Sequence, residues 1–404
     1  MTIPWQAAWH GARRILCIRA DSLGPVLMCT PALRALRAAA PERHLTLLSR
    51  PSSALALPCI PELDAVIPFA APWIDHDDPS RPSLAEMAMR LAERAFDAAV
   101  IFTSFSQSPL PAATLCHLAG IPLRLAACRE HPHGLLSHWL PEREREHASR
   151  HEVQRQLDLV AAIGCTTPDT RLSFDVDEAS ASSLEARLDA AGIDGNKPLL
   201  VLHPGAGAPA RRYPAQLWPA LLRRLATDLQ AVHREFQLVL TGDASEAAGV
   251  AAMIEAARLA TRSSAVGAGG RSGYGSAGAA RITAHSLAGR LTLPELGALL
   301  RRARLLVANN SSPAHIAAAF GTPVVNLYAL TTPEHTPWRV AQRVLFHPVP
   351  CRGCLQSTCP ELHHACLAAL DPDTIVAAVL DLLAATPQRP AHAADTPLAF
   401  VDGA

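Results

Sequence analysis

The feature that most constrains the fold is an alternation of short apolar runs with helical stretches, which occurs once and then begins again. In the first half the runs ILCI (within 13–20), LTLLS, AVIPF and AAVIF have the length of strands, and the stretches 25–39, 83–94, 151–164 and 179–191 have the pattern of helices. Apolar strands separated by helices are typical of a parallel sheet that is covered on both faces. We therefore predict an α/β domain here, with the polar region Arg124–Arg150 as a loop.

A turn cluster, Asp194–Pro198, separates this domain from the second alternation. There we expect strands at 199–205, 236–242, 305–309 and 322–328, and helices at 214–229, 245–259, 292–303 (with Thr292 as its N-cap) and 313–320. The predicted organisation is α/β, with two Rossmann-like domains facing across a cleft, at 1–194 and 195–385. The Gly/Ser/Ala-rich stretch Gly267–Gly278 is expected to be a flexible insertion, and 386–404 a disordered tail.

Composition excludes several classes of protein. Hydrophobic residues make up 49% of the 404 residues, which argues against disorder, and 36 Lys+Arg balance 36 Asp+Glu, so no nucleic-acid partner is expected. No apolar stretch reaches the roughly 18–20 residues of a membrane-spanning helix, and the N-terminal segment does not have the pattern of a signal peptide. We expect a cytoplasmic protein whose ten cysteines are reduced.

Three loops at predicted strand ends carry polar groups suited to anions or proton transfer. The first, Arg19–Pro25, includes Asp21 and opens a helix; by itself it is no more than a strand-to-helix turn. The second, HPGAGAPARRYP (His203–Pro214), holds Arg211 and Arg212, whose guanidinium groups suit phosphate oxygens. The third, at Val307–Val325, holds short polar residues at a helix N-terminus, where N–H groups favour a phosphate: Asn310, Ser311, Ser312 and, one turn on, His315.

A cysteine cluster near the C-terminus has spacings that permit a metal site. Cys351, Cys354, Cys359 and Cys366 could hold structural zinc or an iron–sulfur cluster, with His363 or His364 replacing one ligand. The alternative is that these are reduced structural cysteines or a pair prone to oxidation.

The three loops, in this order and spacing, resemble glycosyltransferase family 9, the lipopolysaccharide heptosyltransferases. The matching segments are IRADSLGPVLMCTPALRALRAAAP, LHPGAGAPARRYPAQLWPALLRRL and LTLPELGALLRRARLLVANNSSPAHIAAAFGTPVVNLYALTTPEHTPW, and Cys359-Pro360 also resembles a segment of that family. The resemblance implies a GT-B fold and inverting transfer of heptose from ADP-heptose to a lipid-linked saccharide acceptor, without a catalytic cofactor or metal.

The resemblance also implies roles for individual residues. The N-terminal domain would hold the acceptor, with Ser22 and Gly24 on the acceptor-side loop, and the C-terminal domain the nucleotide sugar. The donor diphosphate would meet Arg211 and Arg212 and the helix start formed by Asn310, Ser311 and Ser312, with His315 near, and Glu246 would meet the ribose hydroxyls.

This chain departs from the family pattern at two places. Gly24-Pro25 stands where the family usually has Gly-Asp, and that Asp is the expected catalytic base; Asp21, on the same loop, is our substitute. Asn310-Ser311-Ser312 stands where the family favours Asp-Thr-Gly, a change that bears on which sugar is held.

Three alternatives remain open beside an active glycosyltransferase. They are a sugar-nucleotide-binding protein without transfer, suggested by Pro25; a GT-B-shaped sugar-nucleotide epimerase; and an NAD enzyme, disfavoured because no G-x-G-x-x-G follows the first strand. Peripheral contact with the inner membrane would involve the basic segment Arg143–Arg155, although acidic residues in the same span favour a solvated charged face.

Overall fold

A computed structural model of the chain describes residues 4–74, 82–142, 150–232, 236–266, 283–329, 333–351 and 353–386. The chain forms two compact units, which are described separately. Unit 1 comprises Met1–Asp175 with Pro333–Trp338, and unit 2 comprises Val176–Thr332 with Arg339–Ala404.

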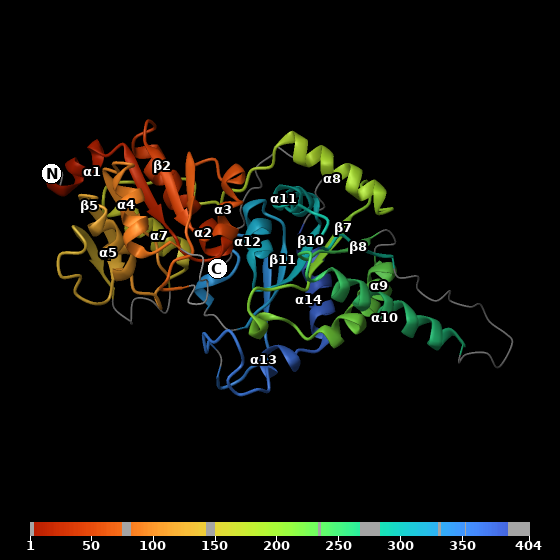
Figure 1. Cartoon of the computed structure of the whole chain (residues 1–404). Helices are drawn as coiled ribbons and strands as arrows, with labels where there is room; N and C mark the ends of the chain where they lie inside the picture. The colour runs from red at the N-terminus through yellow and green to blue at the C-terminus, as the bar shows by residue number, and fades with distance from the viewer. Residues whose placement is uncertain are drawn as a thin grey trace. The chain divides into compact units, whose positions relative to one another are not determined.

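Unit 1 is built on a six-stranded sheet in the order β3-β2-β1-β4-β5-β6, with every neighbouring pair parallel (Figure 1). Its strands are β1 (Arg14–Ile18), β2 (His44–Ser49), β3 (Ala65–Pro68), β4 (Ala98–Ile101), β5 (Leu123–Cys128) and β6 (His138–Pro141). Its helices are α1 (Pro4–Gly11), α2 (Leu23–Ala39), α3 (Pro51–Ala54), η1 (Leu57–Cys59), α4 (Leu84–Ala92), α5 (Leu110–Leu118), α7 (Glu152–Ala161) and η4 (Pro333–His335).

Alternation along β1 determines which helices cover which face of this sheet. Leu16 and Ile18 belong to the buried cluster that α4 and α5 form with the sheet. Ile15 and Cys17 are equally buried and point to the other face, because successive side chains of a strand alternate. On that face α2 packs against α7.

Unit 2 repeats this architecture in a sheet of order β12-β11-β10-β7-β8-β9, again parallel throughout (Figure 1). Its strands are β7 (Leu199–His203), β8 (Gln237–Leu240), β9 (Ala284–Ser286), β10 (Leu305–Asn309), β11 (Val324–Leu327) and β12 (Gln342–Leu345). Its helices are α8 (Glu178–Ala190), η2 (Pro209–Arg211), η3 (Ala215–Leu217), α9 (Trp218–Val232), α10 (Ala247–Val266), α11 (Leu293–Arg302), α12 (Ser312–Ala319), α13 (Ala365–Ala368) and α14 (Pro372–Ala385). Helices α9, α10 and α14 bury one face of the sheet in a single cluster, while α11 contacts α8 and α12.

The two Rossmann-like units confirm the predicted α/β fold, but one predicted loop is wrong. The region Arg124–Arg150 contains most of β5, whose residues 125–128 are buried, and all of β6. The arginines and histidines around them obscured the strands, since the apolar run LRLAAC is short. The N-cap role of Thr292 is confirmed, because its side chain accepts a hydrogen bond from the Glu295 N–H.

The boundary between the two compact units does not coincide with the turn cluster Asp194–Pro198. Helix α8 lies before that cluster but packs with unit 2, where Ser183 and Arg187 both donate to the Glu295 carboxylate of α11 at 2.6 Å. Conversely, the segment 333–338 belongs to unit 1, where the Trp338 indole donates to the Thr170 carbonyl at 2.8 Å.

Some expectations fall outside the described residues. These are the insertion Gly267–Gly278, the tail from 387 and the first part of the basic segment, 143–149. Among the helices that the structure does describe, none is both long and apolar enough to cross a membrane.

Candidate functional site

In each sheet there is one point from which the strand order proceeds toward opposite edges. In unit 1 it lies between β1 and β4, and in unit 2 between β7 and β10. Ligands of open α/β sheets bind outside the carboxyl ends of the strands at this point. The three loops singled out in the sequence follow β1, β7 and β10, so all of them leave the sheets at these two places.

In unit 2, Asn309 joins the loops that follow β7 and β10. Its side chain is fully buried, its Nδ2 donates to the Pro204 carbonyl at 2.5 Å, and its Oδ1 accepts from the Tyr213 N–H at 3.0 Å. Asn309 therefore holds both ends of the arginine-bearing loop against the end of β10. Its neighbours Asn310, Ser311 and Ser312 are predicted site residues from the sequence, whereas the role of Asn309 is evident only from these contacts.

Helix α12 begins beside this junction without a side-chain cap. Ser311 is its N-cap residue, but the hydroxyl donates to the Asn309 carbonyl at 3.1 Å and does not accept from the helix. Pro313 has no N–H, so Ser311 and Ser312 carry the amides at the helix start, where the partial positive charge favours an anion. Asn310 is buried at the same end of β10, and His315 is buried in the first turn of the helix.

The two arginines of the β7 loop have different surroundings. The Arg212 Nε donates to the Ala206 carbonyl at 2.8 Å, so this side chain ties the loop to itself. Arg211 ends the short helix η2 and is partly buried. One arginine of this loop is thus half-buried and the other exposed.

Glu246 lies where the loops after β7 and β8 meet. Its carboxylate occupies the space that a side chain at Gly205 would need, since a Cβ there would lie 2.3 Å from Oε2, and a Cβ at Gly242 would lie 2.9 Å from the same atom. Oε2 also accepts from the Asp243 N–H at 3.0 Å. The two glycines thus allow a carboxylate to sit at the carboxyl ends of β7 and β8.

Burial keeps the histidine at the end of β7 neutral. The His203 Nδ1 lies 3.0 Å from the Thr241 hydroxyl, and burial lowers the pKa of His203 to about 4. Near neutral pH, His203 therefore adds no positive charge to this region.

In unit 1, Asp21 follows β1 and is held on both carboxylate oxygens. Oδ1 accepts from the Gln107 Nε2 at 2.6 Å, and Oδ2 lies 2.8 Å from the Arg19 Nε in an ion pair. The backbone carbonyl of Asp21 accepts from the Ser53 hydroxyl at 3.1 Å. The side chain is 16% exposed, so a fixed carboxylate still reaches solvent.

Behind Asp21 lies a buried network that the sequence analysis did not predict. Arg19 is 1% exposed and donates from Nη1 to Glu152 at 2.9 Å, and Glu152 has no exposed side-chain surface. Burial opposes ionisation of Glu152, but Arg19 and Arg155 outweigh it and hold the pKa of Glu152 below its ordinary value. A charged residue directly after an otherwise apolar strand was the available signal for Arg19.

The loop around Pro25 offers no second carboxylate. Ser22 is the N-cap residue of α2 without a side-chain cap bond, and Gly24 and Pro25 lie in the first turn of that helix. Within the loop Arg19–Pro25, Asp21 is the only residue with a carboxylate that can take a proton.

The segment Pro333–Trp338 also contacts this part of unit 1. The His151 Nε2 donates to the Thr336 carbonyl at 2.9 Å while its Nδ1 caps α7 by accepting from the Val153 N–H. Burial lowers the pKa of His151 to about 4, so the ring is neutral. His335, on the same segment, is close enough for its pKa to respond to Glu152, Arg19 and Asp21.

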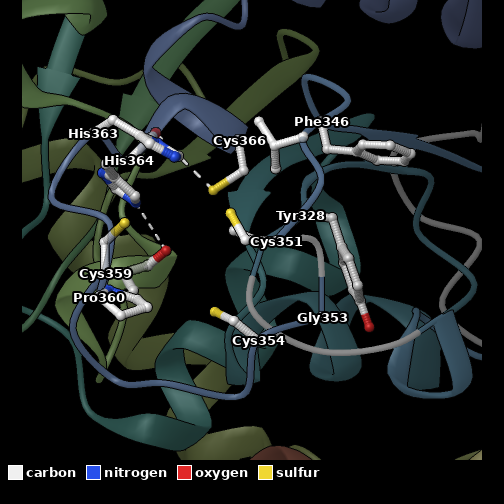
Figure 2. Close-up of a pocket in the computed structure, with 13 residues that line it drawn as sticks. Tyr328, Phe346, Cys351, Gly353, Cys354, Cys359, Pro360, His363, His364 and Cys366 are labelled. Atoms are coloured by element: carbon white, nitrogen blue, oxygen red, sulfur yellow. Dashed lines mark hydrogen bonds between the residues drawn. The ribbon is translucent and has the colours of Figure 1, made fainter.

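The four cysteines of the C-terminal cluster line one pocket of unit 2, together with His363 and His364 (Figure 2). Figure 2 shows the sulfurs of Cys351 and Cys366 facing each other, with those of Cys354 and Cys359 on other sides of the same space. Over the described part of the chain, however, no three His, Cys, Asp or Glu side chains converge as metal ligands, so in this arrangement the residues do not form a ligand set.

Comparison with known proteins identifies the family. The sequence model of glycosyltransferase family 9 (heptosyltransferase) matches residues 84–365. The chain belongs to glycosyltransferase family 9. The loops His203–Pro214 and Val307–Val325 lie within the matched residues, and the loop Arg19–Pro25 lies before them.

Relatives and solved structures agree with the family. Lipopolysaccharide heptosyltransferase 3 of Escherichia coli is 50% identical over 54 residues, which is 13% of this chain and only 15% of the relative's length. The structure of E. coli ADP-heptose LPS heptosyltransferase II has a TM-score of 0.65 at 21% identity, covering 92% of this chain and 99% of that one. A family 9 glycosyl transferase from Veillonella parvula has a TM-score of 0.70 at 18% identity, covering 96% and 99%. These two structures show that the family 9 chain has the two-domain GT-B fold.

Proposed function

We propose that this family 9 chain is an inverting glycosyltransferase that moves heptose from ADP-heptose to a saccharide acceptor of the lipopolysaccharide core. The observation that carries the proposal is the uncapped start of α12 beside the arginine loop, the two being joined through Asn309. An amide-rich helix terminus and a guanidinium group are complementary to a diphosphate.

The donor would bind at the carboxyl ends of β7, β8 and β10. Arg211 and the amides of Ser311 and Ser312 would hold the diphosphate, with Arg212, Asn310 and His315 supporting the loop and helix around it. Glu246 stands at the adjoining strand ends, where a carboxylate can accept hydrogen bonds from both ribose hydroxyls.

Asp21 would act as the base of the transfer. An acceptor hydroxyl gives its proton to the Asp21 carboxylate while its oxygen forms the new bond to the anomeric carbon. The bond from that carbon to the diphosphate oxygen breaks with its electron pair, and ADP leaves on the opposite face, so the configuration inverts. Ser22 and Gly24 would lie beside the acceptor at the same loop.

The family name and the names of the similar heptosyltransferases support a heptose donor. A cytoplasmic location, with peripheral contact at the inner face of the membrane, follows from the same proposal, since lipid-linked core sugars are made there. The first part of the basic segment Arg143–Arg155 lies outside the described residues.

A structural zinc or iron–sulfur cluster at the four cysteines remains a separate proposal, supported by the pocket that they share. Binding would require the sulfurs to converge further than they do here. Metal analysis of the purified protein, compared with the Cys354→Ser variant, decides it: less than about 0.1 metal ion per chain in the native protein would end this proposal.

The test of the main proposal begins with thermal unfolding in ADP, UDP and GDP sugars. A ligand present at a hundredfold excess over its Kd stabilises by about 2.7 kcal/mol, and we expect this for ADP-heptose. Sugar transfer is then measured with and without a saccharide acceptor of the lipopolysaccharide core. Binding without transfer to any core acceptor would favour a transfer-deficient protein, and release of free sugar without acceptor would favour an epimerase-like enzyme.

A further inference from the structure

We infer that Gln107 is a positioning residue, which holds the carboxylate of Asp21 in the orientation needed to accept a proton. This inference rests on the proposed role of Asp21 as the base. Nothing in the motif of the family loop points to Gln107, which lies 86 residues away in the sequence. The tertiary structure brings the two together where β1 and β4 end side by side.

Gln107 is itself held in one orientation by the loop after β4. Its backbone N–H donates to the Ser104 carbonyl at 3.0 Å, and its side-chain Oε1 accepts from the Ser104 N–H at 3.0 Å. With the amide oxygen occupied in this way, the Nε2 group points to Asp21, where it donates at 2.6 Å. The reciprocal bonds to Ser104 determine which end of the amide faces the carboxylate.

The opposite oxygen of Asp21 is held by a buried chain of charges. Arg19 lies between Asp21 and Glu152, and Glu152 also accepts from Gln156 at 2.7 Å. Because Arg19 is 1% exposed and paired on two sides, it cannot turn to another partner. Gln107 on one oxygen and Arg19 on the other therefore prevent rotation of the carboxylate about χ2.

This arrangement leaves Asp21 able to work as a base. Each carboxylate oxygen has two acceptor sites. Oδ1 accepts one hydrogen bond from Gln107 and Oδ2 is ion-paired with Arg19, so a site remains for the acceptor hydroxyl. A base that is held within hydrogen-bond reach of the reacting proton gains rate through orientation. Because Gln107 acts through the proposed base, its effect is expected in kcat and not in the KM for the donor.

Other groups facing Asp21 have to be counted before pH dependence is used as a test. Arg19, which follows β1, Cys29 on α2 and His335 on η4 interact with Asp21. Glu152 and Arg155 on α7 and Glu334 on η4 interact in turn with these three. Burial raises the pKa of Cys29 to about 12, so it stays a neutral thiol, and burial lowers the pKa of His335, so it is neutral near pH 7. None of these groups is changed by a substitution at position 107.

The decisive variant is Gln107→Glu. It keeps the Oε1 acceptor for the Ser104 N–H but places a second carboxylate against Asp21 in place of a donor. Two carboxylates at hydrogen-bond distance raise the pH needed to ionise both, so we expect the acid limb of the kcat profile to move up by about one pH unit. Gln107→Met, which keeps the length and removes the donor, is expected to lower kcat about tenfold with an unchanged KM.

A matched control exists on the surface of α7. Gln154 donates from Nε2 to the Asp158 carboxylate at 2.8 Å, so Gln154→Glu makes the same change of an amide into a carboxylate facing an aspartate, away from Asp21. We expect no shift of its pH profile and no loss of kcat. Thermal unfolding of all three variants reports whether any of them is misfolded.

The outcomes separate this inference from the proposed function. An unshifted acid limb and a native kcat in a folded Gln107→Glu variant would overturn the positioning role, while Asp21→Asn still abolishes transfer. If Asp21→Asn transfers sugar at the native rate, the base is wrong and the inference fails with it. If Gln107→Glu unfolds, Gln107→Met carries the test: a native kcat there overturns the role, and a tenfold loss with an unchanged KM supports it.

Discussion

The carboxyl ends of β1 and β4 in unit 1 and those of β7 and β10 in unit 2 occupy equivalent places in sheets of the same strand order. In unit 1 the polar side chains there bond to each other, through Glu152, Arg19, Asp21 and Gln107. In unit 2, three side chains at the same place bond to the backbone: Asn309 to two loops, Ser311 to a carbonyl and Arg212 to its own loop. His203 there pairs with another side chain, through the Thr241 hydroxyl.

The difference shows what each unit is suited to do. A network of charges that ends in a slightly exposed carboxylate fixes one acidic group, which suits proton transfer. Side chains that hold loops in place leave the start of α12 without a side-chain cap, which suits an anion. The strand order supplies the location in both units, and the residue types supply the chemistry.

The largest effect is expected from removing the carboxylate of unit 1. Asp21→Asn keeps the size and the acceptor oxygen but cannot take a proton, so transfer should fall by about 10²–10⁴-fold. Binding of ADP, measured by calorimetry, should change less than twofold because the donor groups lie in unit 2. Transfer at more than a tenth of the native rate would remove Asp21 as the base.

The second largest effect is expected from Glu152, the buried carboxylate that pairs with Arg19 behind Asp21. Glu152→Gln removes the buried negative charge that Arg19 and Arg155 share, which leaves Arg19 only Asp21 and Arg155 only Glu142 as acidic partners among the described residues. We expect a loss of about 3 kcal/mol in the free energy of unfolding at neutral pH. The folded-state pKa of Glu152 lies below its ordinary value of 4.5, so its contribution is present above that pH and is lost as the pH falls through the folded pKa.

Denaturant unfolding at pH 7 and at a series of pH values below 4.5 checks this prediction. The difference in the free energy of unfolding between the native protein and the variant should become smaller in acid. The control is Glu185→Gln in unit 2, which removes the half-exposed partner of Arg302 and should cost about 0–1 kcal/mol. Equal losses for the two variants would contradict the difference in burial.

A smaller effect is expected from substitutions in the loop of unit 2 that is proposed to bind the sugar nucleotide. Arg211→Ala removes one charge-assisted contact to the diphosphate, worth about 1.5–3 kcal/mol, so the Kd for ADP should rise about 10–100-fold. Arg224→Ala, which removes an exposed arginine of α9, is the control and should leave the Kd unchanged. If both variants bind ADP like the native protein, the diphosphate lies elsewhere.

The smallest effect compares two helix starts within unit 2. Thr292 forms a capping box with Glu295, so Thr292→Ala should cost about 1 kcal/mol of stability and leave ADP binding unchanged. Ser311 caps nothing, so Ser311→Ala should cost less stability. Chemical denaturation gives both values, and the reverse order would mean that Ser311 serves the helix and not a ligand.

Much of the fold could be predicted from the sequence, because apolar runs of strand length and helical stretches depend on neighbouring residues. The strands around Leu16, Leu202 and Val307 lie where the alternation indicates. β5 and β6 were missed because their apolar residues are few and lie among arginines and histidines. The places of α8 and of the segment 333–338 could not be predicted, since each packs with residues far along the chain.

By itself, the sequence determined two α/β units, three polar loops at strand ends, and the replacement of the family's Asp by Pro25. Only the tertiary structure decided that Asp21 is held by Arg19 and Gln107, that Arg212 braces its own loop, and that Ser311 leaves its helix uncapped. The physical reason is range: strand and helix patterns follow from neighbours in the chain, whereas the orientation of a side chain depends on partners that parallel strands bring together from distant positions.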